Sequence, residues 1–519
     1  MSISGDFISF IFSWGATLIL LYALMSFGSG YSAKKAFTIL GLADFSFILG
    51  VALYIGFTGS TQMPIAKGIM LDRPVVWWAF ILMLTGALAK AGCWPFHTWI
   101  PEAAEDVPIP AMAILPASLD KLMGIYLLAR ICLDFFVLNK TAMGLLLIIG
   151  SLTIIFAVMM ALIQHDLRKL LSYHAISQVG YMVLGFGTGI PIGIAGGIFH
   201  MINNAIYKTG LFLSGGAVGK QRKTFELDQL GGLARYMPFV FMSALVFSLS
   251  ISGMPPFNGF ASKWMLYQGT LLGFMQNTNS GIKVIFIFSL VAAMFGSSLT
   301  LASFVKFIHA VFLGQSNYSV SVGSLRNNIY IILPLGVLAI LCLLLGVLPA
   351  IFLKTFIQPY LVTTVYPWGK YNAPVALSLI ILALIAGLLI WGVMQGKLKI
   401  RKDNYFIGTE MDNYKYSFSA TEFYRTIEGV GVISGLYKIL KTQFLDLYNI
   451  VCKIFNLSAH LFYMFIDRLI YILTNAAGYV ILGLSWILRR FHYGVLDFYL
   501  VWALFGLMVV IFILTIKGI

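Results

Sequence analysis

Long apolar runs separated by short polar segments fill most of the chain. Each run is at least about 20 residues long, enough for an α-helix to cross the hydrocarbon core of a bilayer. A bilayer admits only helices and closed barrels, because it holds no water to satisfy backbone polar groups. The pattern therefore predicts an all-α polytopic membrane protein of about twelve spans, at residues 6–28, 37–58, 74–94, 110–132, 142–163, 169–189, 192–218, 236–275, 283–312, 328–356, 375–396 and 496–517.

Two of these spans are interrupted by proline and glycine. Pro95 closes the run that carries Lys90 and opens an acidic loop at 95–108, and the segment 253–259 divides the span at 236–275 just before Lys263. Proline removes a helical hydrogen bond and clashes with the preceding turn, so neither run continues as one straight helix. Two interrupted spans in corresponding positions are typical of transporters built from inverted repeats.

Ionisable side chains occur inside several of the apolar runs. They are costly in hydrocarbon and indicate functional sites by default. The candidates for an ion path are Lys90, Lys121, Lys208, Lys263, His200, Asp44 and Asp120, and secondary candidates are His174, Lys306 and His309. A buried lysine can change its pKa by several units and so load or release a proton, while histidine titrates near neutral pH.

Each candidate also has a purely structural interpretation. Lys90 could extend to the headgroups, and Asp44 could be satisfied by a neighbouring hydroxyl instead of acting as the counter-charge of Lys90. His200, Asn204 and Lys208 are spaced four residues apart and share one helix face. That face suits either the lining of a hydrated path or polar contacts between helices. His174 could be a hydrogen-bonded core residue.

The character of the chain changes after the eleventh predicted span. Residues 397–420 are polar and basic, and residues 421–490 contain no proline but carry charges at intervals. A single helix over the second stretch would be roughly 105 Å long, so we predict an amphipathic helix lying along the membrane. Two or three shorter helices are the alternative, because Gly429, Gly431 and Gly435 allow breaks. The span at 496–517 would anchor this segment.

Composition and charge support a membrane protein and set its orientation. The chain is 60% hydrophobic and 10% charged, with a mean hydropathy of +0.92 and a formal net charge of +15. Lys and Arg gather in alternate loops, as the positive-inside rule requires, so the charge does not imply a nucleic-acid partner. This rule predicts a cell-membrane protein with both termini outside and the lateral helix on the cytoplasmic side. Basic residues of the cytoplasmic loops include Lys34, Lys35, Arg168, Lys169, Lys220, Arg222, Lys223, Arg235, Arg326, Lys397, Lys399, Arg401 and Lys402.

The four cysteines are scattered at Cys93, Cys132, Cys342 and Cys452. They form no CxxC motif and no Cys/His cluster, which argues against an iron–sulfur cluster, a structural zinc site or a disulfide framework. We therefore expect no cofactor, no metal and no catalytic residue in this chain.

Five segments together resemble the antiporter-like subunits shared by respiratory complex I, Mrp-type sodium/proton antiporters and membrane-bound hydrogenases. They are GALAKAGCWPFHTWIPEA, PIPAMAILPASLDKLMGIYLLAR, DLRKLLSYHAISQVGYMVLG, FHMINNAIYKTGLFLSGG and GMPPFNGFASKW, and they cover most of residues 30–315. The predicted long helix and final span are similar to the distal complex I subunit, whose lateral helix straps its neighbours. PASLDK and FSATEFYRT look most like the subunits of archaeal membrane-bound hydrogenases and related sulfur reductases.

The resemblance assigns roles to individual residues. It implies that Lys90 is the lysine of the first broken helix and that Asp44 is an acidic residue of the preceding helix. Lys208 and His200 match the polar centre of the second half, and Lys263 matches the lysine of the exit half. By this comparison residues 1–135 form a truncated first half-channel repeat and 136–315 a second one. Further spans (316–396), a linker with the lateral helix (397–495) and an anchoring span (496–519) would follow.

Three departures from the family pattern concern the first half. The family normally has some four more spans before this start, so another subunit could supply them. The glutamate of the family's tryptophan–glutamate pair aligns with Gly15, so Asp44 or Asp120 would have to replace it. The family's central histidine or lysine falls near 116–121, with Lys121 one residue away from the usual position, and a second family histidine is Asn204.

The leading hypothesis is an ion-translocating subunit of a redox-driven respiratory complex, which moves H⁺, Na⁺ or both while other subunits transfer electrons. Its partners would be other membrane subunits, including antiporter-like neighbours clamped by the lateral helix, and lipid. One alternative is a non-conducting structural clamp in the same complex, and another is a stand-alone cation/proton antiporter. The parent complex stays open among a hydrogenase, a sulfur reductase and an NADH or ferredoxin dehydrogenase.

Overall fold

The computed structural model describes residues 4–65, 68–114, 119–313, 328–361, 446–492 and 494–518, together with single positions between 378 and 438. They belong to two units, Met1–Tyr448 and Asn449–Ile519. The predicted linker at 397–420 lies outside the described residues, and so do most of the predicted span at 375–396 and most of the segment 421–445.

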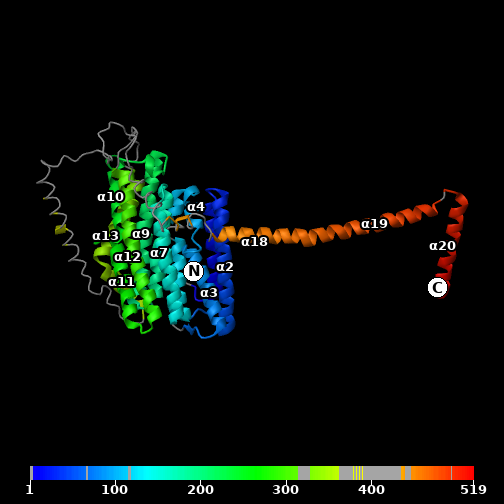
Figure 1. Ribbon diagram of the computed structural model, residues 1–519, viewed down its shortest axis with the longest axis horizontal. Coiled ribbons are helices and arrows are strands. Elements are labelled where there is room, and N and C mark those ends of the chain that lie inside the picture. The colour runs from blue at the N-terminus through cyan, green and yellow to red at the C-terminus, as the bar shows by residue number, and fades with distance from the viewer. Residues whose placement is uncertain are drawn as a thin grey trace. The chain divides into compact units, whose positions relative to one another are not determined.

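The first unit is a bundle of helices, many of them running roughly side by side (Figure 1). Its helices are α1 (Phe7–Met25), α2 (Gly30–Thr58), α3 (Pro74–Ala91), α4 (Trp99–Asp106), α5 (Ile109–Ile114), α6 (Asp120–Arg130), α7 (Lys140–Leu162), α8 (Leu167–Gly187), α9 (Pro191–Arg222), α10 (Pro238–Ser252), α11 (Asn258–Gln276), α12 (Ser280–Ile308), α13 (Ile329–Val347) and α14 (Pro349–Phe352). The strands β1 (Ile69–Met70) and β2 (Phe136–Val137) form a short parallel pair.

Polar side chains cap the first turns of four helices. Ser29, Asn139, Asp166 and Asn279 precede α2, α7, α8 and α12, and each side chain accepts a hydrogen bond from a first-turn backbone N–H. Such caps satisfy donors that have no partner inside the helix. Many of the predicted spans overlap these helices, but the span at 110–132 contains two helices, α5 and α6, and the acidic loop at 95–108 is in part helical, as α4. Pro101 fits the first turn of α4, where its missing N–H costs nothing.

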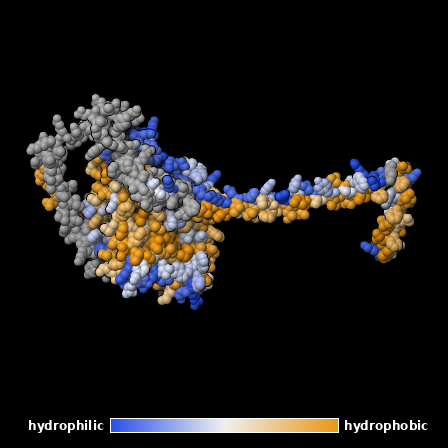
Figure 2. Space-filling view, in the orientation of Figure 1, coloured by the Kyte–Doolittle hydropathy of each residue, from blue (hydrophilic) through white to orange (hydrophobic). Residues whose placement is uncertain are grey.

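On the face of the bundle that Figure 2 shows, a wide apolar band lies between hydrophilic surfaces at the two ends. Across the described residues, eight helical segments are long and apolar enough to cross a membrane. They include α1, α2, α3, α7 and α13, whereas α8, α9 and α11 fall outside this set. Ionisable and polar side chains are buried on these three helices, so they contribute to the interior of the protein.

Both predicted helix breaks are present, and they share one backbone structure. α3 ends at Gly92 and α10 at Gly253, with φ of 76° and 80°, a region that favours glycine. Cys93 donates its N–H to the Leu88 carbonyl at 2.9 Å, and Met254 donates to the Leu249 carbonyl at 3.0 Å. Each of these turns closes with a phenylalanine N–H, from Phe96 and Phe257, that bonds the carbonyl three residues earlier. The sequences GCWPF and GMPPF therefore build the same turn twice.

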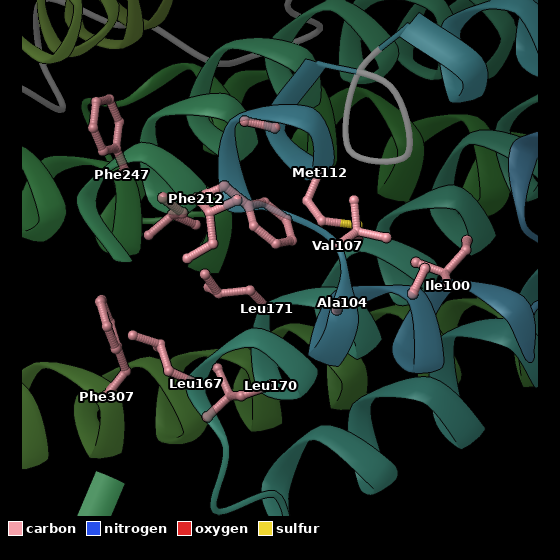
Figure 3. Close-up of a cluster of buried hydrophobic side chains, with 14 of the residues drawn as sticks. Ile100, Ala104, Val107, Met112, Leu167, Leu170, Leu171, Phe212, Phe247 and Phe307 are labelled. Atoms are coloured by element: carbon pink, nitrogen blue, oxygen red, sulfur yellow. The ribbon is translucent and has the colours of Figure 1, made fainter. Parts of the chain in front are cut away.

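Close helix packing fixes the elements around the first break. A Cβ added at Gly124 of α6 would lie 2.3 Å from the backbone nitrogen of Ala91, so α6 and the end of α3 approach each other where only glycine fits. The largest core cluster joins α4 and α5 to α8, α9, α10 and α12 (Figure 3). Among its members are Ile100, Ala104, Val107, Met112, Leu167, Leu170, Leu171, Phe212, Phe247 and Phe307. The two halves of the sequence therefore share one core.

The second unit continues α18 (Leu447–Phe462) through a π-helical turn, η11 (Tyr463–Asp467), into α19 (Arg468–Phe491), and then forms α20 (Leu496–Ile516). Hydrophilic residues line one side of α19 and apolar residues the other (Figure 2), which confirms an amphipathic helix followed by an apolar span. The hypothesis of one helix over 421–490 is wrong. Asp446 is not helical, and its Oδ1 accepts the Tyr448 N–H at 3.1 Å, which starts a new helix there.

Candidate functional site

The first group of buried charges surrounds Lys90, near the end of α3. Lys90 is fully buried and its Nζ lies 3.8 Å from Oδ2 of Asp44 on α2. The same ammonium donates to the Trp14 carbonyl at 3.1 Å and lies 4.3 Å from the centre of the Trp14 ring. Lys90 therefore does not extend to the headgroups, and Asp44 is its counter-charge, which resolves both alternatives left open by the sequence.

Trp14 of α1 completes this group by holding the carboxylate. Its indole Nε1 donates to Oδ1 of Asp44 at 2.6 Å, so the two carboxylate oxygens face different partners. Gly15, where the family pattern expects a glutamate, follows directly. The carboxylate that faces Lys90 thus comes from α2 rather than α1, as anticipated for Asp44.

Asp120 and Lys121 open α6 beside this group. Both are buried, with 0% and 2% of their surface exposed. Neither Asp120 oxygen nor the Lys121 Nζ has a hydrogen-bond partner among the residues that the structure describes. Asp120 is close enough to Lys90 and Asp44 for their charges to interact, so these four side chains form one electrostatic group.

The second half places a polar stripe on α9, as the four-residue spacing predicts. His200 and Lys208 are fully buried, and Asn204 is 2% exposed. His200 Nδ1 lies 2.8 Å from Ser262 Oγ on α11, and its Nε2 lies 3.1 Å from Gln178 Oε1 on α8. Within the described part of the chain, Lys208 Nζ has no hydrogen-bond partner and lies 5.9 Å from the ring centres of Phe212 and Phe304.

Lys263, on α11, turns back toward the broken end of α10. Its Nζ donates to the Ile251 carbonyl at 2.9 Å and to the Ser252 carbonyl at 3.5 Å. These carbonyls form the negative end of the α10 dipole, which favours a cation there. The ring centre of Tyr181 lies 4.7 Å from the same nitrogen. The break thus supplies the electrostatic partner of a buried lysine.

Two asparagines that the sequence analysis did not single out hold this break against α9. Asn203 Nδ2 donates to the Asn258 carbonyl at 2.9 Å, and Asn258 Nδ2 donates to Asn203 Oδ1 at 3.0 Å. Ser250 Oγ donates to Asn258 Oδ1. Gln178 was also missed, although it joins His200 to α8. An amide next to a proline-marked break is the only signal that could have pointed to Asn258.

The secondary candidates separate into two kinds. His174 is fully buried and its Nε2 lies 2.6 Å from Ser303 Oγ on α12. Lys306, also on α12, is 2% exposed and donates to the carbonyls of Leu162 and Gln164 at 2.9 and 2.8 Å. His309 is exposed, so it lies outside the buried set.

The two groups are connected through neighbouring charges. Lys208 is close enough to Lys121 for their charges to interact, and His174 interacts in the same way with Lys208, Lys263 and Lys306. A helical bundle with two broken helices and ionisable groups buried along its interior defines a membrane protein of the ion-transporter class. The chain belongs to the NADH:quinone oxidoreductase/Mrp antiporter transmembrane family, whose model matches residues 4–273.

Relatives from archaea and bacteria are similar to this chain. An uncharacterized protein of Methanocaldococcus jannaschii is 34% identical over 333 residues, which are 62% of this chain and 65% of that protein. Subunit A1 of a Na⁺/H⁺ antiporter of Staphylococcus aureus is 29% identical over 380 residues, 69% of this chain. The chain spans 47% of that subunit's length.

Two solved structures share the fold. A membrane-bound sulfane sulfur reductase, an archaeal respiratory membrane complex, contains a chain that matches 98% of this one and is matched over 81% of its own length. The TM-score is 0.70 at 23% identity, a likeness that concerns the fold alone. Respiratory complex I from Thermus thermophilus gives a TM-score of 0.56 at 25% identity and covers 68% of this chain and 75% of its own.

Proposed function

We propose that the chain is an ion-translocating subunit of a redox-driven membrane complex and that it moves protons along its buried lysines. The observation that carries this proposal is the Lys90–Asp44 pair beside a broken helix, which is buried and linked electrostatically to Asp120 and Lys121. Ionisable groups buried in a membrane are costly, and a purely structural bundle has no need of four such lysines.

The residues would act by exchanging charge between neighbours. A lysine beside a carboxylate is stabilised in its charged form, and it loses that stabilisation when the two separate. Movement of Lys90 away from Asp44 would therefore release a proton toward the next basic groups, Lys121 and Lys208. Lys263 and His200 would carry it onward, and Asp120 would modulate the transfer between the halves. Because these groups interact, they titrate as a set.

The chemistry of the path favours H⁺ over Na⁺. Lysine ammonium groups carry and donate protons but cannot coordinate a cation, whereas a sodium site needs several oxygen ligands. The path would thus pass H⁺, and any Na⁺ movement would take place elsewhere in the complex.

Partners and orientation follow from the same proposal. The relatives include a subunit of a Na⁺/H⁺ antiporter, and the fold occurs in an archaeal sulfane sulfur reductase and in complex I. We infer that other membrane subunits surround this chain, with the α18–α19 helix along the cytoplasmic surface and both termini outside. The distribution of Lys and Arg among the loops supports this orientation.

The test is transport by the purified complex in vesicles whose internal pH is followed by a fluorescent dye. Lys90→Ala, Lys208→Ala and Lys263→Ala should each lower proton transport by about tenfold or more, because each removes a buried cation from the path. The complex should still assemble. Lys140→Ala is the control, since Lys140 is exposed at the start of α7 and its loss should leave transport unchanged. Normal transport by all three buried-lysine variants would overturn the proposal.

A structural clamp is the second candidate function, and the amphipathic α18–α19 helix favours it. A clamp would retain both assembly and the transport of its neighbours after any of the three lysine substitutions. It would lose assembly when the amphipathic helix is altered. The two functions therefore depend on different parts of the chain and are measured separately.

A further inference from the structure

A second charged cluster lies away from the proposed ion path, where α18 begins. Lys35 of α2 is fully buried, and its Nζ lies 2.6 Å from Glu102 Oε1 on α4 and 2.5 Å from Asp446 Oδ2. The Asp446 side chain is also completely buried. Buried charges are rarely found without a partner, and here one lysine joins two carboxylates that are far apart in the sequence.

The Asp446 carboxylate is held from three directions. Its Oδ1 accepts the Thr98 hydroxyl at 2.8 Å and the Tyr448 backbone N–H at 3.1 Å, while Oδ2 faces Lys35. The rings of Tyr31 and Tyr448 meet edge to face with their centres 5.9 Å apart. This one side chain therefore ties the first turn of α18 to α2 and to the turn that precedes α4.

These two attachment points belong to the elements that carry the Asp44–Lys90 pair. α2 bears both Lys35 and Asp44, and Thr98 follows the break that ends the helix of Lys90. The same turn is fixed on its other side, where Thr153 Oγ1 lies 3.0 Å from Cys93 Sγ. A displacement of Asp446 would therefore move α2 and the α3–α4 turn relative to each other.

The two halves differ in the contact made by the residue that follows each repeated turn at the same spacing. Glu102 follows Gly92 by the same number of residues as Lys263 follows Gly253. In the second half the side chain at this position turns back on its own break, where Lys263 donates to Ile251 and Ser252. In the first half Glu102 instead contacts Lys35, so the first break is held by a contact that includes Asp446.

We propose that the Lys35–Glu102–Asp446 cluster is the anchor that joins the amphipathic C-terminal helix to the first broken helix, and that Asp446 positions the Asp44–Lys90 pair. The anchoring part of this proposal does not depend on transport. The positioning part rests on the proposed function only in its effect on ion transport. The geometry of the Asp44–Lys90 pair itself can be observed without a transport measurement.

The first measurement is a cross-link across the anchor in the full-length chain within its complex. Cysteines replace Tyr31 and Tyr448, Cys452→Ser removes the partly exposed natural thiol, and a short thiol-reactive cross-linker is added. Asp446→Asn and Lys35→Met should lower the cross-link yield about tenfold. Lys34→Met is the matched control, because Lys34 is the exposed neighbour of Lys35, and it should cross-link normally. Unchanged yields in both anchor variants would overturn the anchor.

The second measurement reads the Asp44–Lys90 pair through Trp14, which contacts both residues. The complex is labelled with 5-fluorotryptophan, and Trp14→Phe assigns the ¹⁹F resonance of Trp14. Asp446→Asn should shift this resonance, whereas Lys34→Met should not. A lost cross-link with an unmoved Trp14 resonance would overturn the positioning role. Thr98→Val removes only one hydroxyl donor and should give a smaller change of the same kind even where the charge variants do not fold.

Neither measurement uses ion transport. Normal transport by the Lys90→Ala, Lys208→Ala and Lys263→Ala variants would reject the proposed function and leave both results standing. Failure of the cross-link to respond would reject the anchor and leave the proposed function standing.

Discussion

At the scale of single residues, Trp14 is the side chain on which the Lys90 group is built. Its indole N–H binds Asp44, its carbonyl accepts from Lys90, and its ring lies beneath the same ammonium. One residue thus orients both members of an ion pair that is buried in an apolar interior. A lysine beside an aromatic face also gains cation–π attraction, which is larger when water is absent.

Trp14→Phe should retain an aromatic ring, with some loss of packing, but remove the donor to Asp44. A hydrogen bond to a charged group contributes about 1.5–3 kcal/mol, so we expect proton transport to fall by about tenfold. Asp44→Asn should cost more, because it removes the carboxylate that is paired with the Lys90 ammonium. Vesicle transport assays of the two variants measure which of them loses more proton transport. A Trp14→Phe variant with less activity than Asp44→Asn would contradict it.

His97, in the turn before α4, should stay neutral well below neutral pH. Its Nδ1 has no hydrogen-bond partner among the described residues. Burial lowers the pKa of His97 to about 4; the negative charge of Asp446 opposes this shift and the positive charge of Lys35 adds to it. An unfolded chain binds this proton below about pH 6.5, so the contribution of His97 to stability decreases as the pH falls from about 6.5 toward 4.

Histidine-selective NMR titration of the labelled protein measures that pKa. We expect a midpoint near 4 in the native chain. Lys35→Met should raise the midpoint, because it removes a nearby cation, and Asp446→Asn should lower it. A native midpoint near the ordinary value for histidine would show that the turn is open to solvent.

At the scale of elements, the helix breaks and the close approach of α6 to α3 decide where the charges lie. Gly92 and Gly253 end their helices in the left-handed conformation, and Gly124 lets α6 pack directly against the end of α3. Asp120 and Lys121 open that same helix. The separation of α3 and α6 therefore controls how strongly Asp120 interacts with Lys90.

Gly124→Val should force α6 away from α3, since even a Cβ would overlap the Ala91 backbone. Overpacking of this kind costs about 1–3 kcal/mol, so thermal unfolding in detergent should occur several degrees lower. Gly15→Ala is the control, because no atom lies within 4 Å of an added Cβ there. Equal unfolding temperatures for the two variants would contradict the close packing.

At the scale of the whole molecule, the chain combines a bundle with a second unit of different character. In α19 apolar residues such as Leu473 and Leu484 are 59% and 55% exposed. An amphipathic helix of this size needs a lipid surface or protein neighbours to cover its apolar side. The second unit therefore presents an apolar surface suited to contact with lipid or with protein neighbours.

Leu484→Asp should weaken the association of neighbouring subunits, because it places a charge on the apolar side of α19. Asn475→Asp, on the polar side, should have little effect. Quantitative co-purification of the complex from membranes compares the two. Equal recovery of partners with both variants would exclude the apolar side as a contact surface.

Much of the fold could be predicted from the sequence, because the length of an apolar run and the position of a proline determine the structure of the segment that contains them. The breaks predicted at Pro95 and at 253–259 and the shared face of His200, Asn204 and Lys208 are of this kind. The pairing of Asp44 with Lys90 could only be suggested, since it depends on how α2 packs against α3. The Lys35–Asp446 contact left no local signal, because its partners are joined only by tertiary structure.

Some predictions failed for physical reasons, and others stay predictions. The long C-terminal helix was expected to begin near Thr421, but hydrophobic pattern does not show that the Asp446 side chain caps a new helix. The loop at 95–108 contains α4 because Pro101 is compatible with a helix start. The boundaries of the half-channel repeats and the roles of the buried residues in ion movement stay predictions.

The matching hydrogen bonds in GCWPF and GMPPF have a consequence for the origin of the chain. Two copies of an unusual backbone turn, each ending a helix, are what duplication of an ancestral half-length gene would leave behind. The backbone of each copy is then an exchangeable module. A chimaera carrying GMPPF in both places should still fold, losing the contacts that Cys93 and the Trp94 N–H make with Thr153 and the ring contact of Trp94 with Phe156.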